Sequence, residues 1–165
     1  MVAYTVSFFG HRQLNCLSAV EKCLEDLIGQ LLREHEYVVF LVGRNGEFDQ
    51  AVSSAVRRAK HIVREDNCTH ILVLPYETAE VRNNRKAFLA YYDEIEVCEA
   101  ATKAHYKSAI QVRNKQMVDR SDLVIFYVEN ERGGAYQTLK YAEKQRIHII
   151  NIAKKAGDGI SYGFG

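Results

Sequence analysis

The stretch that decides the fold is residues 37–49, which read YVVFLVGRNGEFD. Its first six residues are apolar and mostly β-branched or aromatic, which is typical of a strand buried on both faces. Gly43 and Gly46 follow at once, and apolar residues at helical spacing begin at Val52. A buried strand that runs through a glycine-containing turn into a helix predicts one βαβ unit of a parallel sheet.

The same alternation extends in both directions along the chain. Apolar runs of strand length also occur at residues 4–9, 70–74, 122–128 and 148–152, and helical spacing is found at 17–31, 52–63, 105–120 and 134–145. Residues 76–104 are less regular, and we expect a mobile loop and a short helix there. The pattern predicts a Rossmann-like α/β fold with a five-stranded, mainly parallel sheet and helices on both faces.

Length and composition set limits on the function. The 165 residues suit a single domain over 1–156 followed by a flexible glycine-rich tail over 157–165. The net charge of +1 gives no overall field toward nucleic acid or an anionic membrane, so an anion site must be local. The four cysteines and six histidines lack metal-ligand spacing, and no run is long enough for a membrane helix. We therefore expect a soluble cytoplasmic protein without metal or cofactor.

Three turns follow strands and therefore lie where ligands bind in a doubly wound sheet. They are Gly10-His11-Arg12, residues 43–49 and residues 129–134. Glycines before a helix let its free N–H groups approach an anion, although the same glycines also suit a plain strand-to-helix turn. Asp49 is equally open to two interpretations, because an aspartate at a helix start is commonly a cap.

The third turn and the helix before it add further candidates. Gly133-Gly134 marks a second helix entry, with Thr138 one turn further along. Arg113 falls on the apolar stripe of its helix, so its guanidinium requires either a structural carboxylate or a ligand phosphate. Asn114 follows it and has a side chain that suits a sugar or a turn carbonyl, and two glycine-marked entries at one sheet edge favour a phosphate site.

In their order along the chain, these motifs resemble the YpsA-type branch of the SLOG superfamily. The motifs are Phe9-Gly10-His11-Arg12, residues 43–50, residues 113–122, and Gly133-Gly134 through Thr138 and Tyr141-Ala142. The resemblance implies a Rossmann-like fold and a pocket for a nucleotide-like ligand, and relatives that form dimers make a homodimer one expected state. By analogy, the pocket residues are Gly10, His11, Arg12, Gly43, Arg44, Gly46, Glu47, Asp49, Arg113, Asn114, Gly133, Gly134 and Thr138.

The relatives suggest three functions, and fold alone does not choose among them. The leading hypothesis is a binding or sensor domain for a nucleotide or an ADP-ribose-like molecule. The second is N-glycosidic hydrolysis of a nucleoside monophosphate, as in the LOG phosphoribohydrolases, but their catalytic glutamate is missing after Thr138, so Glu47 or Asp49 would have to act. The third is single-stranded DNA binding as in the DprA proteins, which the near-zero net charge disfavours.

Overall fold

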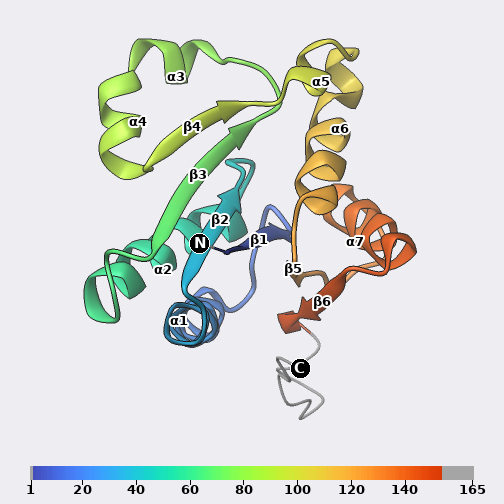
Figure 1. The fold of residues 1–165 in the computed structure, drawn as a ribbon. Helices are drawn as coiled ribbons and strands as arrows, with labels where there is room; N and C mark the ends of the chain where they lie inside the picture. The colour runs from blue at the N-terminus through green and yellow to red at the C-terminus, as the bar shows by residue number, and fades with distance from the viewer. Residues whose placement is uncertain (1, 154–165) are drawn as a thin grey trace.

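The computed structural model describes residues 2–153, and Figure 1 shows their arrangement. Six strands form one sheet in the order β4-β3-β2-β1-β5-β6, and every neighbouring pair is parallel. The strands are β1 (Ala3–Gly10), β2 (Tyr37–Val42), β3 (Cys68–Leu74), β4 (Glu94–Val97), β5 (Leu123–Tyr127) and β6 (His148–Asn151). The predicted Rossmann-like class is confirmed, and the proposed tail at 157–165 lies outside the described residues.

The prediction of five strands is wrong by one, because β4 lies inside the stretch that was expected to be a loop. It pairs with the edge of β3, with Glu94 opposite Ile71. Its four residues alternate between charged and aliphatic, and none of them is fully buried. A short, partly exposed edge strand lacks the continuous apolar run that identified the other five.

Seven helices occur within the described residues. They are α1 (Leu17–Glu34), α2 (Glu47–Ile62), α3 (Ala79–Asn83), α4 (Arg85–Tyr91), α5 (Glu99–Thr102), α6 (Tyr106–Asp119) and α7 (Gly134–Gln145). None of them is both long and apolar enough to cross a membrane. The helices predicted between strands are confirmed, and the irregular stretch holds α3, α4 and α5 around β4.

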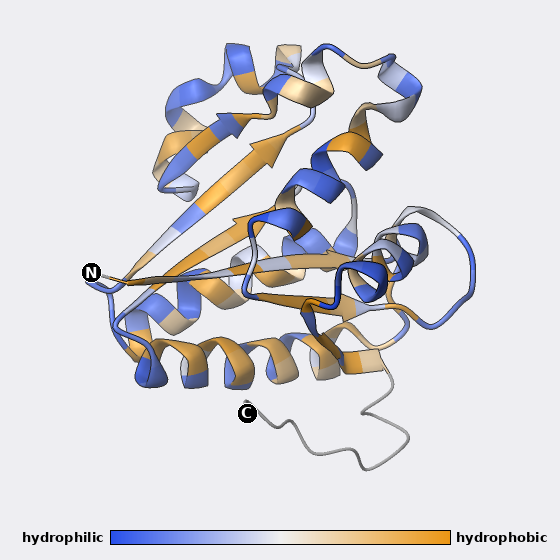
Figure 2. Cartoon of the chain, turned by 45° about the vertical axis from the view of Figure 1, so that its right-hand side comes forward, coloured by the Kyte–Doolittle hydropathy of each residue, from blue (hydrophilic) through white to orange (hydrophobic). Residues whose placement is uncertain are grey.

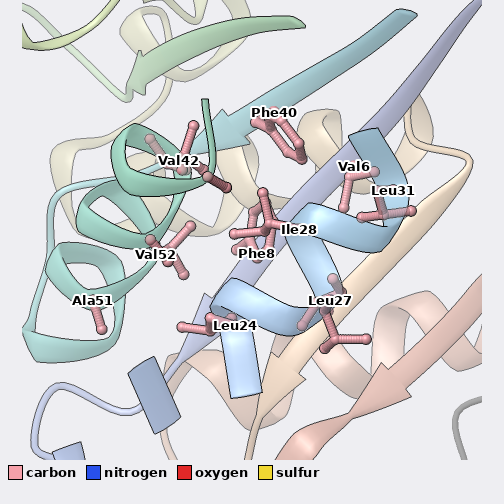
Figure 3. Close-up of a cluster of buried hydrophobic side chains, with 14 of the residues drawn as sticks. Val6, Phe8, Leu24, Leu27, Ile28, Leu31, Phe40, Val42, Ala51 and Val52 are labelled. Atoms are coloured by element: carbon pink, nitrogen blue, oxygen red, sulfur yellow. The ribbon is translucent and has the colours of Figure 1, made fainter. Parts of the chain in front are cut away.

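The helices cover both faces of the sheet, as expected. One hydrophobic cluster joins α1 and α2 to the sheet, and a second joins α6 and α7 to the opposite face. Figure 2 shows the hydrophobic residues on the strands and on the helix faces toward them. In Figure 3, Leu24 and Ile28 of α1 and Val52 of α2 approach Phe8 and Phe40 of the sheet. Burying each of these larger side chains contributes about 1.5–3 kcal/mol, so this packing stabilises the scaffold around the site.

The strand order reverses at β1. From β1 the chain adds β2, β3 and β4 on one side, and it then crosses over to place β5 and β6 on the other. The carboxyl ends of β1 and β5 are level, with Gly10 opposite Tyr127. The connections leaving these two neighbouring strands diverge to opposite faces, which leaves a crevice at their carboxyl ends.

Candidate functional site

A cavity of about 340 Å³ lies at this reversal point. All three predicted turns contribute to it, together with α6. Its lining consists of Phe8, Phe9, Gly10, His11, Arg12, Gly43, Asn45, Asp49, Ile110, Arg113, Asn114, Gly133, Gly134 and Ala135. Segments about a hundred residues apart in the sequence therefore meet around one space.

The turn that enters α2 is closed by its own hydrogen bonds. The Asn45 N–H donates to Oδ2 of Asp49 at 2.8 Å, and the Glu47 N–H donates to the Arg12 carbonyl at 2.9 Å. Gly46 is packed so tightly that a Cβ there would lie 2.5 Å from Cα of Arg12. Two amides at this helix start are thus already satisfied inside the protein.

The turn that enters α7 is open. Gly133 has a φ of 94°, in the region that favours glycine, and a Cβ there would meet no atom within 4 Å. The first turn of α7 contains no acidic residue, and no side chain of the described residues caps it. Gly133, Gly134 and Ala135 all line the cavity, so this helix start can offer backbone N–H groups and its positive dipole end to an anion.

Arg113 forms the floor of the cavity. Its side chain is only 2% exposed, and it donates from Nη1 to the Val73 carbonyl and from Nε to Oδ1 of Asn114. Asn114 in turn donates to the Thr138 hydroxyl, and that hydroxyl donates to the Gly134 carbonyl. This chain of hydrogen bonds fixes the start of α7 against α6. The hydrogen-bond acceptors of Arg113 are thus the Val73 carbonyl and the Asn114 side-chain amide.

Asp49 places a carboxylate on the cavity wall next to this guanidinium. A Cβ on Gly43 would lie 3.1 Å from Nη1 of Arg113 and 3.2 Å from Oδ2 of Asp49, so any other residue there would require these two side chains to shift. Burial raises the pKa of Asp49, and the Asn45 amide and the positive charge of Arg113 oppose that shift. Burial also lowers the pKa of Arg113, which the charge of Asp49 opposes. The cavity thus holds one buried cation beside one acid of increased proton affinity.

His11 lines the cavity, but one of its nitrogens has a structural partner. Its Nε2 accepts from the Glu129 N–H at 2.8 Å and from the Asn130 N–H at 3.3 Å. The ring in this state carries its proton on Nδ1 and anchors the beginning of the loop before α7. Arg12 is exposed and also lines the cavity, whereas Arg113 is buried, so Arg12 is the more accessible of the two arginines.

Four predicted residues lie outside the cavity lining. Arg44 bonds Glu80 of α3, and the carboxylate of Glu47 accepts from the Leu14 N–H at 2.7 Å. Gly46 packs against Arg12, and Thr138 is buried beneath the start of α7.

Five lining residues were not predicted. They are Phe8, Phe9, Asn45, Ile110 and Ala135. Ile110 had a usable signal, because it lies three residues before Arg113 and therefore on the same helix face.

The site has no evident place for a metal ion. Within residues 2–153, no group of three or more His, Cys, Asp or Glu side chains is arranged to hold one. The polar groups that line the cavity are backbone amides, the side chains of two arginines and two asparagines, one imidazole and one carboxyl group.

Comparison with known proteins supports the fold and leaves the family open. No family model matches the sequence, and no curated protein matches it. The structure is similar to DNA processing protein A (DprA) from Streptococcus pneumoniae, with a TM-score of 0.62, 17% identity and 88% of this chain covered. It is also similar to DprA from Helicobacter pylori, with a TM-score of 0.62 and 15% identity over the same share. The chain spans 49% and 63% of those two proteins.

Proposed function

We propose that this chain binds a small nucleotide-type phosphate ligand in the cavity at the reversal point of the sheet. The observation that carries the proposal is the convergence of the open α7 start, Arg12 and the buried Arg113 on one space of about 340 Å³. That volume is at the lower end of the range of small-molecule sites. The fold likeness to DprA and the ordered motifs also support membership of the SLOG superfamily, with the YpsA-type branch as our assignment.

The phosphate binds at α7 and not at α2. Uncapped N–H groups at a helix start attract an anion, whereas two amides at the start of α2 already donate to Asp49 and Arg12. Arg12 at the rim adds a charge-assisted hydrogen bond to the phosphate. Asp49, on the opposite wall, accepts a hydrogen bond from a hydroxyl group of the sugar.

Calorimetric titration with nucleoside monophosphates, ribose 5-phosphate and sulfate tests the proposal. We expect binding that depends on the phosphate group and weakens about tenfold in Arg12→Ala, because one charged hydrogen bond is lost. Arg33→Ala is the matched control, since Arg33 is exposed in α1 and does not line the cavity. The proposal fails if every ligand gives a flat titration, or if both arginine variants weaken binding equally.

A second function is favoured by one observation, namely that a carboxyl group of raised pKa faces the same cavity. Such a group suits protonation of a leaving base, so the bound nucleotide would be a substrate for N-glycosidic hydrolysis with Asp49 as the acid. Release of free base, followed by chromatography, measures this activity. We expect Asp49→Asn to abolish release and Glu47→Gln to retain it, because the Glu47 carboxylate bonds the Leu14 amide.

Single-stranded DNA binding is the third candidate, since the Helicobacter pylori neighbour is described by its single-stranded DNA binding mode. The basic side chains of α2, which are Arg57, Arg58 and Lys60, give it little support. Arg58 pairs with Glu21 and Glu25, and Lys60 pairs with Asp93. A mobility shift that weakens steeply with salt would favour DNA over the small ligand.

A further inference from the structure

The phosphate cavity continues into a second pocket at the carboxyl end of β3. This pocket has a volume of about 100 Å³. Asn45, Ile110 and Arg113 line both spaces, so the two are adjacent parts of one groove along the sheet edge. A ligand whose phosphate lies at α7 can therefore extend past Arg113 toward β3.

The walls of the second pocket differ in kind from those of the first. Leu74 and Val81 are buried apolar side chains, Pro75 follows β3, and Ile110 closes the side toward the cavity. Tyr76 presents a partly exposed aromatic ring. Apolar and aromatic surfaces suit a flat heterocyclic ring, which gains dispersion and stacking contacts there, and the polar residues of the lining leave hydrogen-bonding groups at its edge.

The rim of this pocket carries a donor and an acceptor side by side. Nη2 of Arg44 lies 2.8 Å from Oε1 of Glu80, and the Arg44 guanidinium also packs over the Phe88 ring at 4.9 Å. Both side chains remain substantially exposed, at 39% and 58%, so both are accessible to a ligand at the rim. The stacking on Phe88 keeps the guanidinium oriented at the rim.

This arrangement matches one edge of guanine. Guanine carries the O6 acceptor beside the N1–H and N2–H donors, so a guanidinium faces O6 while a carboxylate accepts from N1 and N2. Adenine has an amino group in the place of O6, which would put a donor against the guanidinium.

We propose that the pocket at the end of β3 is a base subsite and that Arg44 and Glu80 select a guanine nucleotide. The inference rests on the proposed function, because the phosphate at α7 fixes where the base reaches. It assigns a role to Arg44 that differs from phosphate binding, and it adds Glu80, which the motifs did not contain.

Titration with GMP, AMP and ribose 5-phosphate tests the inference. We expect the wild-type protein to bind GMP about tenfold more tightly than AMP, as one well-placed base contact gives. Glu80→Gln should lose most of this preference while its affinity for ribose 5-phosphate stays unchanged. A lost preference for GMP together with an unchanged affinity for ribose 5-phosphate identifies a base contact. It excludes a general loss of ligand affinity in the cavity.

Glu77→Gln is the matched control, because Glu77 is exposed, precedes α3 and does not line the pocket. It should retain the preference for GMP, and the thermal midpoints of both glutamate variants should equal that of the wild type. Equal binding of GMP and AMP, or tighter binding of AMP, overturns the guanine subsite and leaves the proposed phosphate site in place. If ribose 5-phosphate and both nucleotides fail to bind, the proposed function falls and this inference falls with it.

Discussion

The starts of α2 and α7 meet at one cavity, yet they differ in what their backbone amides do. At α2 the Asn45 amide donates to Asp49, and the Glu47 amide donates to the Arg12 carbonyl. At α7 the glycine at the helix start is open to solvent, and the first turn contains no acid. The α2 start is therefore satisfied from within, and the α7 start is available to a ligand.

This difference shows that glycines before a helix are not sufficient to form an anion site. An acid at the third helical position, as Asp49 is in α2, can occupy the place that an anion would take. In this protein one helix start supplies structure and a hydrogen-bond acceptor, while the other supplies positive potential. A ligand with a phosphate at one end and hydroxyl groups beyond it fits that division.

The largest predicted effect is on the free energy of unfolding, because the starts of α2 and α7 are packed differently. Gly46→Ala should destabilise the fold by about 3 kcal/mol, because the new Cβ would lie 2.5 Å from Cα of Arg12 and the backbone must move. The φ of Gly46 is 179°, which alanine adopts easily, so the loss is steric. Gly133→Ala should cost less, about 2 kcal/mol, because its φ of 94° and ψ of 176° lie in a region essentially restricted to glycine, while the new Cβ would meet no atom within 4 Å. Urea unfolding measures both, and equal losses would show that the two turns are packed alike.

An acidic residue introduced into the first turn of α7 would make the start of this helix resemble that of α2. Ala135→Asp places a carboxylate at the second helical position and on the cavity wall, where it should weaken binding of ribose 5-phosphate at least about tenfold through charge repulsion. Gln137→Glu adds the same charge near the same helix start, but outside the cavity lining, and should change the affinity little. Equal weakening in both variants would point to a general charge effect, and no weakening in either would remove the phosphate from α7.

More of the sheet than of the site could be predicted from the sequence. Five strands are continuous apolar runs because parallel strands are covered on both faces, and that pattern is visible in the sequence. β4 has one neighbour and a charged, partly exposed sequence, so its pairing depends on β3 and not on its own residues. Long-range pairing of this kind leaves no local signal.

Within the site, the three turns were predictable and the direction of the side chains was only partly so. Glu47 and Asp49 are two residues apart on a helix, so their side chains point about 200° apart and only one of them can face the cavity. Which one does so follows from the register of α2 against β1, where Phe48 is buried beside Gly10. The partners of Arg113, the carbonyl of Val73 and the amide of Asn114, depend on how α6 crosses β3.

The smallest predicted effect isolates the charge of Asp49. Sulfate is a suitable probe, because it has no hydroxyl group for Asp49 to accept from and stays a dianion from about pH 5 to pH 8. Burial raises the pKa of Asp49, so its negative charge is absent below that pKa and appears as the pH rises through it. We expect Asp49→Asn to bind sulfate about fivefold more tightly than the wild type at any pH where Asp49 is charged, and equally tightly where Asp49 is protonated. Asp26→Asn, an exposed change in α1, should match the wild type throughout. Equal affinities of the two proteins at every pH would mean that Asp49 does not repel an anion in this cavity, and the division between the two helix starts would rest on backbone geometry alone.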